Sequence, residues 1–261
     1  MAPMTDRSTN TGSDAVDKPV LDTLHFLGDS HLRVPRAAYE AGLFGKTPCV
    51  FELVRGATAV GLRHPTSKTQ ALVQYRSSLL PYRRGVIPIF QIGEVDCGFV
   101  IWLRAQRRGE SVDAQLLASI SAYRAFLREI KAAGYCPIAT SATLPTLQDG
   151  ALEGEISLLR AKVKASYRER TDLTLRYNEM LRAGCVEDGI DYLDFTPDFI
   201  DTETRLLNEW FRHPDRNDHH LHPERAGAIW VARVLDFVRR RVPSAPRKTS
   251  LFRRWLRILG Y

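Results

Sequence analysis

Residues 28–31, Gly-Asp-Ser-His, place a hydroxyl where the chain turns after the short apolar run 24–27. The glycine permits a sharp turn, and the free N–H groups at the start of a following helix could stabilise a developing oxyanion. Ser30 is therefore a candidate nucleophile. A turn that simply caps a helix is the alternative interpretation of the same residues.

Residues 217–224, Asn-Asp-His-His-Leu-His-Pro-Glu, could supply the groups that such a serine needs. A serine hydroxyl is a poor nucleophile until a base removes its proton, and a carboxylate must fix the tautomer of an imidazole base. Asp218 could orient the base, which could be His220 or His222. The proline at position 223 suits the first position of a helix, so these side chains would precede that helix.

The same region is rich in residues that bind metals, which raises a competing interpretation. Adjacent histidines rarely point at one ion, so we expect no metal and no other cofactor. The six side chains concerned are His213, Asp215, Asp218, His219, His220 and His222.

Two further clusters follow apolar runs. Gly56 comes after the run 49–54, and its N–H could approach an atom held above Ser30. Residues 93–96, Gly-Glu-Val-Asp, come after the run 86–92 and place two carboxylates, Glu94 and Asp96, where burial could shift a pKa. An ordinary loop at Gly56 and a helix cap at Asp96 are the alternatives.

Strands and helices alternate along the chain in the way that a parallel sheet requires. Strands that are apolar on both faces need helices on both sides, so we expect a three-layer α/β/α sandwich around a mostly parallel, five-stranded sheet. Ligands of such sheets bind at the carboxyl ends of the strands, where all four clusters stand. The predicted strands are 24–27, 49–54, 86–92, 136–140 and 192–195, and the predicted helices are 34–43, 67–80, 111–134, 160–183 and 223–241.

Charge and cysteine content argue against several classes of protein. The net charge is +7, but basic residues concentrate after position 238, and no aromatic-interleaved basic motif is present, so we expect no nucleic-acid partner. The four cysteines form no C-x-x-C pair and fall in or beside apolar runs, which predicts buried, reduced thiols. No apolar run approaches the ~18 residues of a membrane span.

The two ends of the chain differ from the predicted domain, residues 21–242. Residues 1–20 are rich in polar side chains and lack the apolar stretch of a secretory signal, which predicts a disordered lead on a cytoplasmic protein. Residues 243–261 form a basic amphipathic tail. This tail could lie on an anionic membrane surface, giving a peripheral contact, or pack on its own domain.

Taken in order, the four clusters resemble the sequence blocks of the SGNH/GDSL hydrolase superfamily. Residues 26–30 are similar to block I, Gly56 to block II, residues 93–96 to block III and residues 217–224 to block V. The resemblance implies a flavodoxin-like sandwich, Ser30 as nucleophile, a histidine base with an aspartate shortly before it, and oxyanion donors from the first three blocks. Ser30 and Gly56 would be two of those donors.

The resemblance also assigns the base and shows two departures. The order His-Leu-x-Pro-Glu from position 220 favours His220 as base with Asp218 as orienter, and His222 remains the alternative. Asn217 stands where the family usually has its aspartate, and Val95 replaces the asparagine that donates to the oxyanion. Loss of one such donor typically costs about 10²–10³ in rate. The other polar residues expected in the pocket are Asp29, His31, Glu94, Asp96 and His222.

The sequence therefore predicts a serine-dependent ester hydrolase that acts on an acylated small molecule, sugar or lipid. Because of Val95 and Asn217, a catalytically impaired module that binds a glycan or an acyl group is a second hypothesis. A third is an acyltransferase of envelope polysaccharide assembly, since the same serine chemistry delivers an acyl group to an alcohol when water is excluded.

Overall fold

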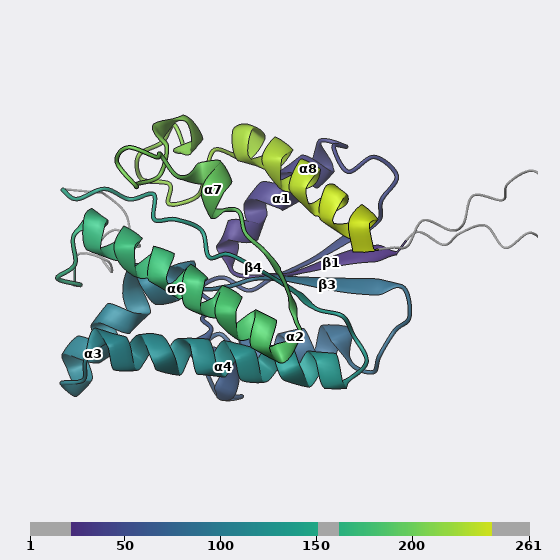
Figure 1. Ribbon diagram of the computed structural model, residues 1–261, viewed down its shortest axis with the longest axis horizontal. Helices are drawn as coiled ribbons and strands as arrows, with labels where there is room; N and C mark the ends of the chain where they lie inside the picture. The colour runs from purple at the N-terminus through teal and green to yellow at the C-terminus, as the bar shows by residue number, and fades with distance from the viewer. Residues whose placement is uncertain (1–21, 151–161, 242–261) are drawn as a thin grey trace, which may run out of the picture.

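The computed structural model of the chain describes residues 22–150 and 162–241, and its centre is one parallel sheet. The strand order is β2-β1-β3-β4-β5, which is the flavodoxin-like order. The three-layer sandwich and the five-stranded sheet are thus confirmed (Figure 1). The strands are β1 (Thr23–Gly28), β2 (Cys49–Leu53), β3 (Val86–Gln91), β4 (Ile138–Thr140) and β5 (Asp191–Leu193).

Helices cover both faces of the sheet, as right-handed crossovers require. One face carries α1 (Arg33–Glu40), α7 (Thr196–Phe199) and α8 (Pro223–Arg241), with α1 packed against α8 (Figure 1). The opposite face carries α2 (Ala71–Leu79), α3 (Ile101–Arg108), α4 (Val112–Ala132) and α6 (Tyr167–Asp188).

Side chains of the central strands alternate between two cores, because successive residues of a strand point to opposite faces. Phe26 of β1 and Ile89 of β3 are fully buried on the side of α1 and α8. Their neighbours Leu27 and Phe90 are fully buried in the core beneath α4 and α6. These strands are apolar on both faces because each face packs against a layer of helices.

The segment after β3 differs from the sequence prediction. A π-helical turn, η3 (Asp96–Val100), leads directly into α3, which the sequence analysis did not predict. Only Ile101 and Ala105 of α3 are buried, so its apolar stripe is too short to stand out among arginines. The helix predicted at 160–183 begins at Tyr167, where Ser166 and Glu169 form a capping box.

The cysteines are free, but they are not all buried. Cys97 and Cys185 are buried and Cys49 is partly buried, whereas Cys136 is exposed, so the prediction of four buried thiols is wrong at Cys136. Cys185 also lies within α6 and not beside a strand.

The two end segments of the sequence prediction, residues 1–20 and 243–261, lie outside the described residues. Among the residues that are described, no helix combines the length and the hydropathy needed to cross a membrane.

Candidate active site

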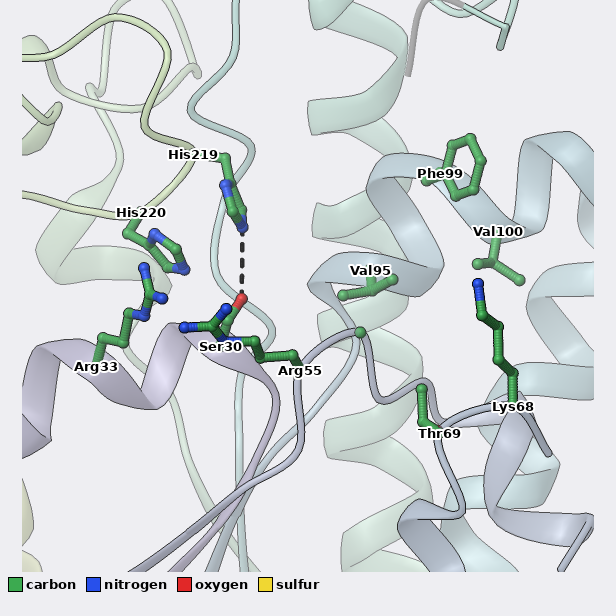
Figure 2. A pocket seen from close by; sticks show the side chains of 11 residues that line it. Ser30, Arg33, Arg55, Lys68, Thr69, Val95, Phe99, Val100, His219 and His220 are labelled. Carbon is green, nitrogen blue, oxygen red and sulfur yellow. Dashed lines mark hydrogen bonds between the residues drawn. The ribbon is translucent and has the colours of Figure 1, made fainter. Parts of the chain in front are cut away.

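The clusters after β1, β2 and β3 and the histidine segment before α8 meet at one pocket of about 580 Å³ (Figure 2). Ser30, Gly56 and His220 all line it, as the sequence predicted for an active site at the carboxyl ends of the strands. The full lining is Ser30, Arg33, Arg55, Gly56, Lys68, Thr69, Val95, Phe99, Val100, His219 and His220.

A glycine and an aspartate set the position of Ser30. A Cβ atom on Gly28 would lie 2.2 Å from the carbonyl oxygen of Gln91, so only glycine lets β1 end this close to β3. Asp29 then caps the short helix η1 (Ser30–Leu32), since its carboxylate accepts a hydrogen bond of 2.9 Å from the N–H of His31. Because Asp29 supplies the cap, the Ser30 hydroxyl is left for the pocket.

The Ser30 hydroxyl faces a histidine that the sequence analysis did not select. Its Oγ lies 3.4 Å from Nε2 of His219, and Figure 2 shows His220 beside this pair. The ring centroids of His219 and His220 are 4.0 Å apart. The only signal for His219 in the sequence was its place in the run of histidines, which does not say which ring points at the serine.

His220 and Asp218 form the pair that the sequence predicted. Oδ1 of Asp218 lies 2.5 Å from Nδ1 of His220 and also accepts a hydrogen bond of 2.9 Å from the N–H of His220. A carboxylate accepts, so Nδ1 carries the proton and the lone pair is on Nε2. Nε2 of His220 is buried and has no hydrogen-bond partner among the described residues.

The surroundings of Asp218 and His220 lower the pKa of both side chains. Burial lowers the pKa of His220 below 6.5, although the hydrogen bond to Asp218 raises it in part. The same hydrogen bond holds the pKa of Asp218 well below its ordinary value. At neutral pH His220 is therefore uncharged and able to accept a proton, and Asp218 is ionised.

His31 joins the serine turn to the histidine segment. Its Nδ1 lies 3.0 Å from Oδ1 of Asp29, and its Nε2 lies 3.2 Å from the carbonyl oxygen of His219. Both partners offer oxygen atoms that accept hydrogen bonds from an imidazole N–H. Oε2 of Glu94, which is also buried, lies 3.8 Å from Nε2 of His31. These contacts fix the backbone of His219 relative to Ser30.

Asp96 holds the loop that follows Gly56. Its fully buried carboxylate accepts hydrogen bonds from the N–H groups of Ala59 and Val60, at 2.7 and 3.1 Å, and from the Ser119 hydroxyl at 2.7 Å. Burial raises its pKa to about 6, and these hydrogen bonds oppose the rise. Asp96 therefore does not cap the helix that it begins, and its carboxylate instead accepts from the N–H groups at the start of η2 (Val60–Arg63).

Backbone donors for an oxyanion are present at Ser30 and Gly56. Gly56 adopts a φ of 71°, a conformation that favours glycine. Among the described residues, no hydrogen bond uses the N–H of Ser30 or of Gly56. Val95 lines the same pocket with an apolar side chain, so it supplies no side-chain donor there.

The remaining polar residues expected in the pocket do not line it. His222 is not a lining residue, and its N–H donates a hydrogen bond to the carbonyl of Phe211. Each of Asp218, His219 and His220 offers an atom that could bind a metal, all within 4.8 Å of one another. A cation there would compete with the hydrogen bond between Asp218 and His220. The other residues that the sequence placed in the pocket and that do not line it are Asp29, His31, Glu94 and Asp96.

Comparison with known proteins shows the fold. No protein-family model matches this sequence, and no curated protein matches it. A GDSL-like lipase from Bacteroides thetaiotaomicron superimposes with a TM-score of 0.56, at 13% identity over 84% of this chain and 88% of that one. An acetyl xylan esterase superimposes with a TM-score of 0.51, at 12% identity over 83% of this chain and 99% of that one. The chain has the fold of these structures, so the resemblance is confirmed at the level of fold.

Proposed function

We propose that this chain is a serine hydrolase that cleaves carboxylic esters, with Ser30 as its nucleophile. The observation that carries the proposal is the Ser30 hydroxyl in a pocket beside His219 and His220, with His220 bound to Asp218. Nucleophile, base and orienter are the three groups that serine catalysis requires. The fold shared with a lipase and an acetyl xylan esterase supports the same chemistry.

The proposed reaction has two steps. Ser30 Oγ attacks the ester carbonyl as its proton passes to Nε2 of His220, and the N–H groups of Ser30 and Gly56 hold the oxyanion. The tetrahedral species collapses, the C–O bond to the alcohol breaks, and His220 returns the proton to the leaving oxygen. Water then attacks the acyl-serine with His220 as base and the same two N–H groups as oxyanion donors. This step releases the carboxylic acid and restores Ser30.

We propose His220 as the base because Asp218 fixes its tautomer. Proton transfer needs a contact of roughly 2.6–3.2 Å, and neither ring makes it here: His219 Nε2 lies 3.4 Å from Ser30 Oγ, and among the described residues no hydrogen bond joins Ser30 to His220. His220 has a buried Nε2 with no described partner and a carboxylate on its Nδ1. The transfer requires the Ser30 side chain to turn from His219 toward His220.

A fluorophosphonate probe, which reacts only with an activated serine, tests the proposal. We expect the wild-type chain to form an adduct, the Ser30→Ala variant to form none, and the His220→Ala variant to react far more slowly. Ser77→Ala, which removes an exposed hydroxyl from α2, is the matched control and should label like wild type. A wild-type chain that forms no adduct would instead favour the binding module, with Val95 in place of an oxyanion donor.

The pH dependence should report His220. We expect kcat/KM to rise with pH through a pKa below 6.5 and to level off by neutral pH, because only the uncharged ring accepts a proton. Asp96, with a pKa of about 6, titrates in the same range. The Asp218→Asn variant distinguishes His220 from Asp96. Loss of the hydrogen bond that raises the pKa of His220 moves the rise in kcat/KM to lower pH, whereas a rise caused by Asp96 would stay at the same pH.

A further inference from the structure

Three basic side chains line the pocket, and no carboxylate does. Arg33 begins α1, Arg55 follows β2, and Lys68 precedes α2. Within residues 22–150 and 162–241, none of these three forms an ion pair, whereas Arg36 on the same helix as Arg33 pairs with Glu40 at 2.9 Å. The positive charge of the pocket is therefore not neutralised by the described protein.

Two of these cations lie beside the proposed nucleophile and base. Figure 2 shows Arg55 extending toward Ser30, and Arg33 beside His220. Arg33 is close enough to His220 for its charge to contribute to the lowered pKa of that ring. An anionic group bound between the two guanidinium groups would thus lie next to the reacting atoms.

Much of the wall away from the two arginines is apolar, with Lys68 and Thr69 beside it (Figure 2). Val95, Phe99 and Val100, from η3 and the turn before it, line the pocket on the side away from the two arginines (Figure 2). A hydrocarbon chain would lose water against these side chains. The pocket therefore offers two guanidinium groups on one side and, on the other, an apolar patch with one lysine beside it.

We propose that the substrate is an ester that carries an anionic oxygen group, a carboxylate or a phosphate, bound by Arg33 and Arg55. The planar guanidinium matches both groups with paired hydrogen bonds. The acyl part packs on the apolar wall while its carbonyl meets Ser30. This inference rests on the proposed ester hydrolysis and names the substrate class of that same site.

Aryl acetates that differ in charge test the substrate class. The specificity ratio is the kcat/KM measured with the anion 4-acetoxybenzoate divided by the value measured with its methyl ester. A second ratio, with 4-acetoxyphenyl phosphate in place of 4-acetoxybenzoate, makes the same comparison for a phosphate. In the double variant Arg33→Gln, Arg55→Gln we expect the ratio to fall at least about tenfold, since one charge-assisted hydrogen bond is worth that factor. Comparing ratios cancels the intrinsic reactivity of each ester.

Arg36→Gln is the matched control, because it removes the same charge from α1 outside the pocket. Its ratio should equal that of wild type, and raising the salt concentration should lower the wild-type ratio. A ratio that the double variant leaves unchanged, in a chain that does hydrolyse esters, overturns the substrate class alone. The carboxylate and phosphate arms show which anionic group is preferred.

Binding to the Ser30→Ala chain separates this inference from the proposed function. Calorimetry compares 4-acetoxybenzoate with its methyl ester without any turnover. Tighter binding of the anion, lost on adding Arg33→Gln and Arg55→Gln, supports the substrate class even if the wild-type chain hydrolyses nothing. Equal binding of the two esters contradicts the substrate class whatever the catalytic result.

Discussion

Replacing Ser30 by alanine should lower kcat/KM for 4-nitrophenyl acetate by at least about 10³-fold, because no other group then forms the acyl bond and only binding and the oxyanion donors remain. The measurement is the initial rate of 4-nitrophenol release at neutral pH. Retention of more than about one tenth of the wild-type rate would place the nucleophile elsewhere.

The same variant should fold as well as the wild type. The hydroxyl of Ser30 contacts His219 at 3.4 Å, whereas the cap of η1 comes from Asp29. Truncation therefore leaves the local hydrogen bonds of the turn in place, and we expect a change in the free energy of unfolding within about 0.5 kcal/mol. A thermal melt of both proteins distinguishes loss of chemistry from loss of structure.

The wild-type rate itself should be modest, and Val95 is the reason. Two backbone donors, from Ser30 and Gly56, are available for the oxyanion, while the side chain of Val95 donates nothing. One missing donor typically costs about 10²–10³ in rate. Activated esters and a sensitive assay are therefore needed for the comparison with Ser30→Ala.

The position of the site could be predicted from the sequence because it depends on the sheet. Short apolar runs mark the buried strands, and parallel strands bring their carboxyl ends to one edge. Ser30 and Gly56 follow two such strands directly, so their meeting at one pocket needed no further information. The cap by Asp29 and the turn at Gly28 are equally local.

What the sequence could not predict depends on contacts between distant segments. His219 and His220 are neighbours in an irregular segment, and Nε2 of His31 lies 3.2 Å from the backbone carbonyl oxygen of His219, whose ring contacts Ser30. That contact joins residues 188 positions apart. Periodicity says nothing about it, because the segment has no regular structure.

The sequence could not predict which basic residues line the pocket, for a similar reason. Arg33, Arg55 and Lys68 come from three different segments, and the chain has 37 lysines and arginines in all. Only the fold selects three of them for one cavity. Arg170 likewise has no local signal for its surroundings, and its side chain is buried and donates to the carbonyl of Leu147.

The two histidines should respond very differently to substitution. We expect His220→Ala to lower kcat/KM at least about 10³-fold, because it removes the base, and Asp218→Asn to lower it by about 10²–10⁴-fold, because the tautomer is no longer fixed. His219→Ala should cost less than about tenfold, since the bond between Asp218 and His220 is unaffected. Steady-state kinetics on 4-nitrophenyl acetate compare the three variants.

This ordering decides between two bases on one loop. If His219→Ala loses more activity than His220→Ala, the base is the histidine that contacts Ser30 in the structure, and Asp218 acts on the site only through the neighbouring ring. Addition of EDTA to the wild type supplies the control for a bound cation at Asp218, His219 and His220. Proton transfer through His220 predicts an unchanged rate, whereas a required metal predicts loss of activity in the wild type.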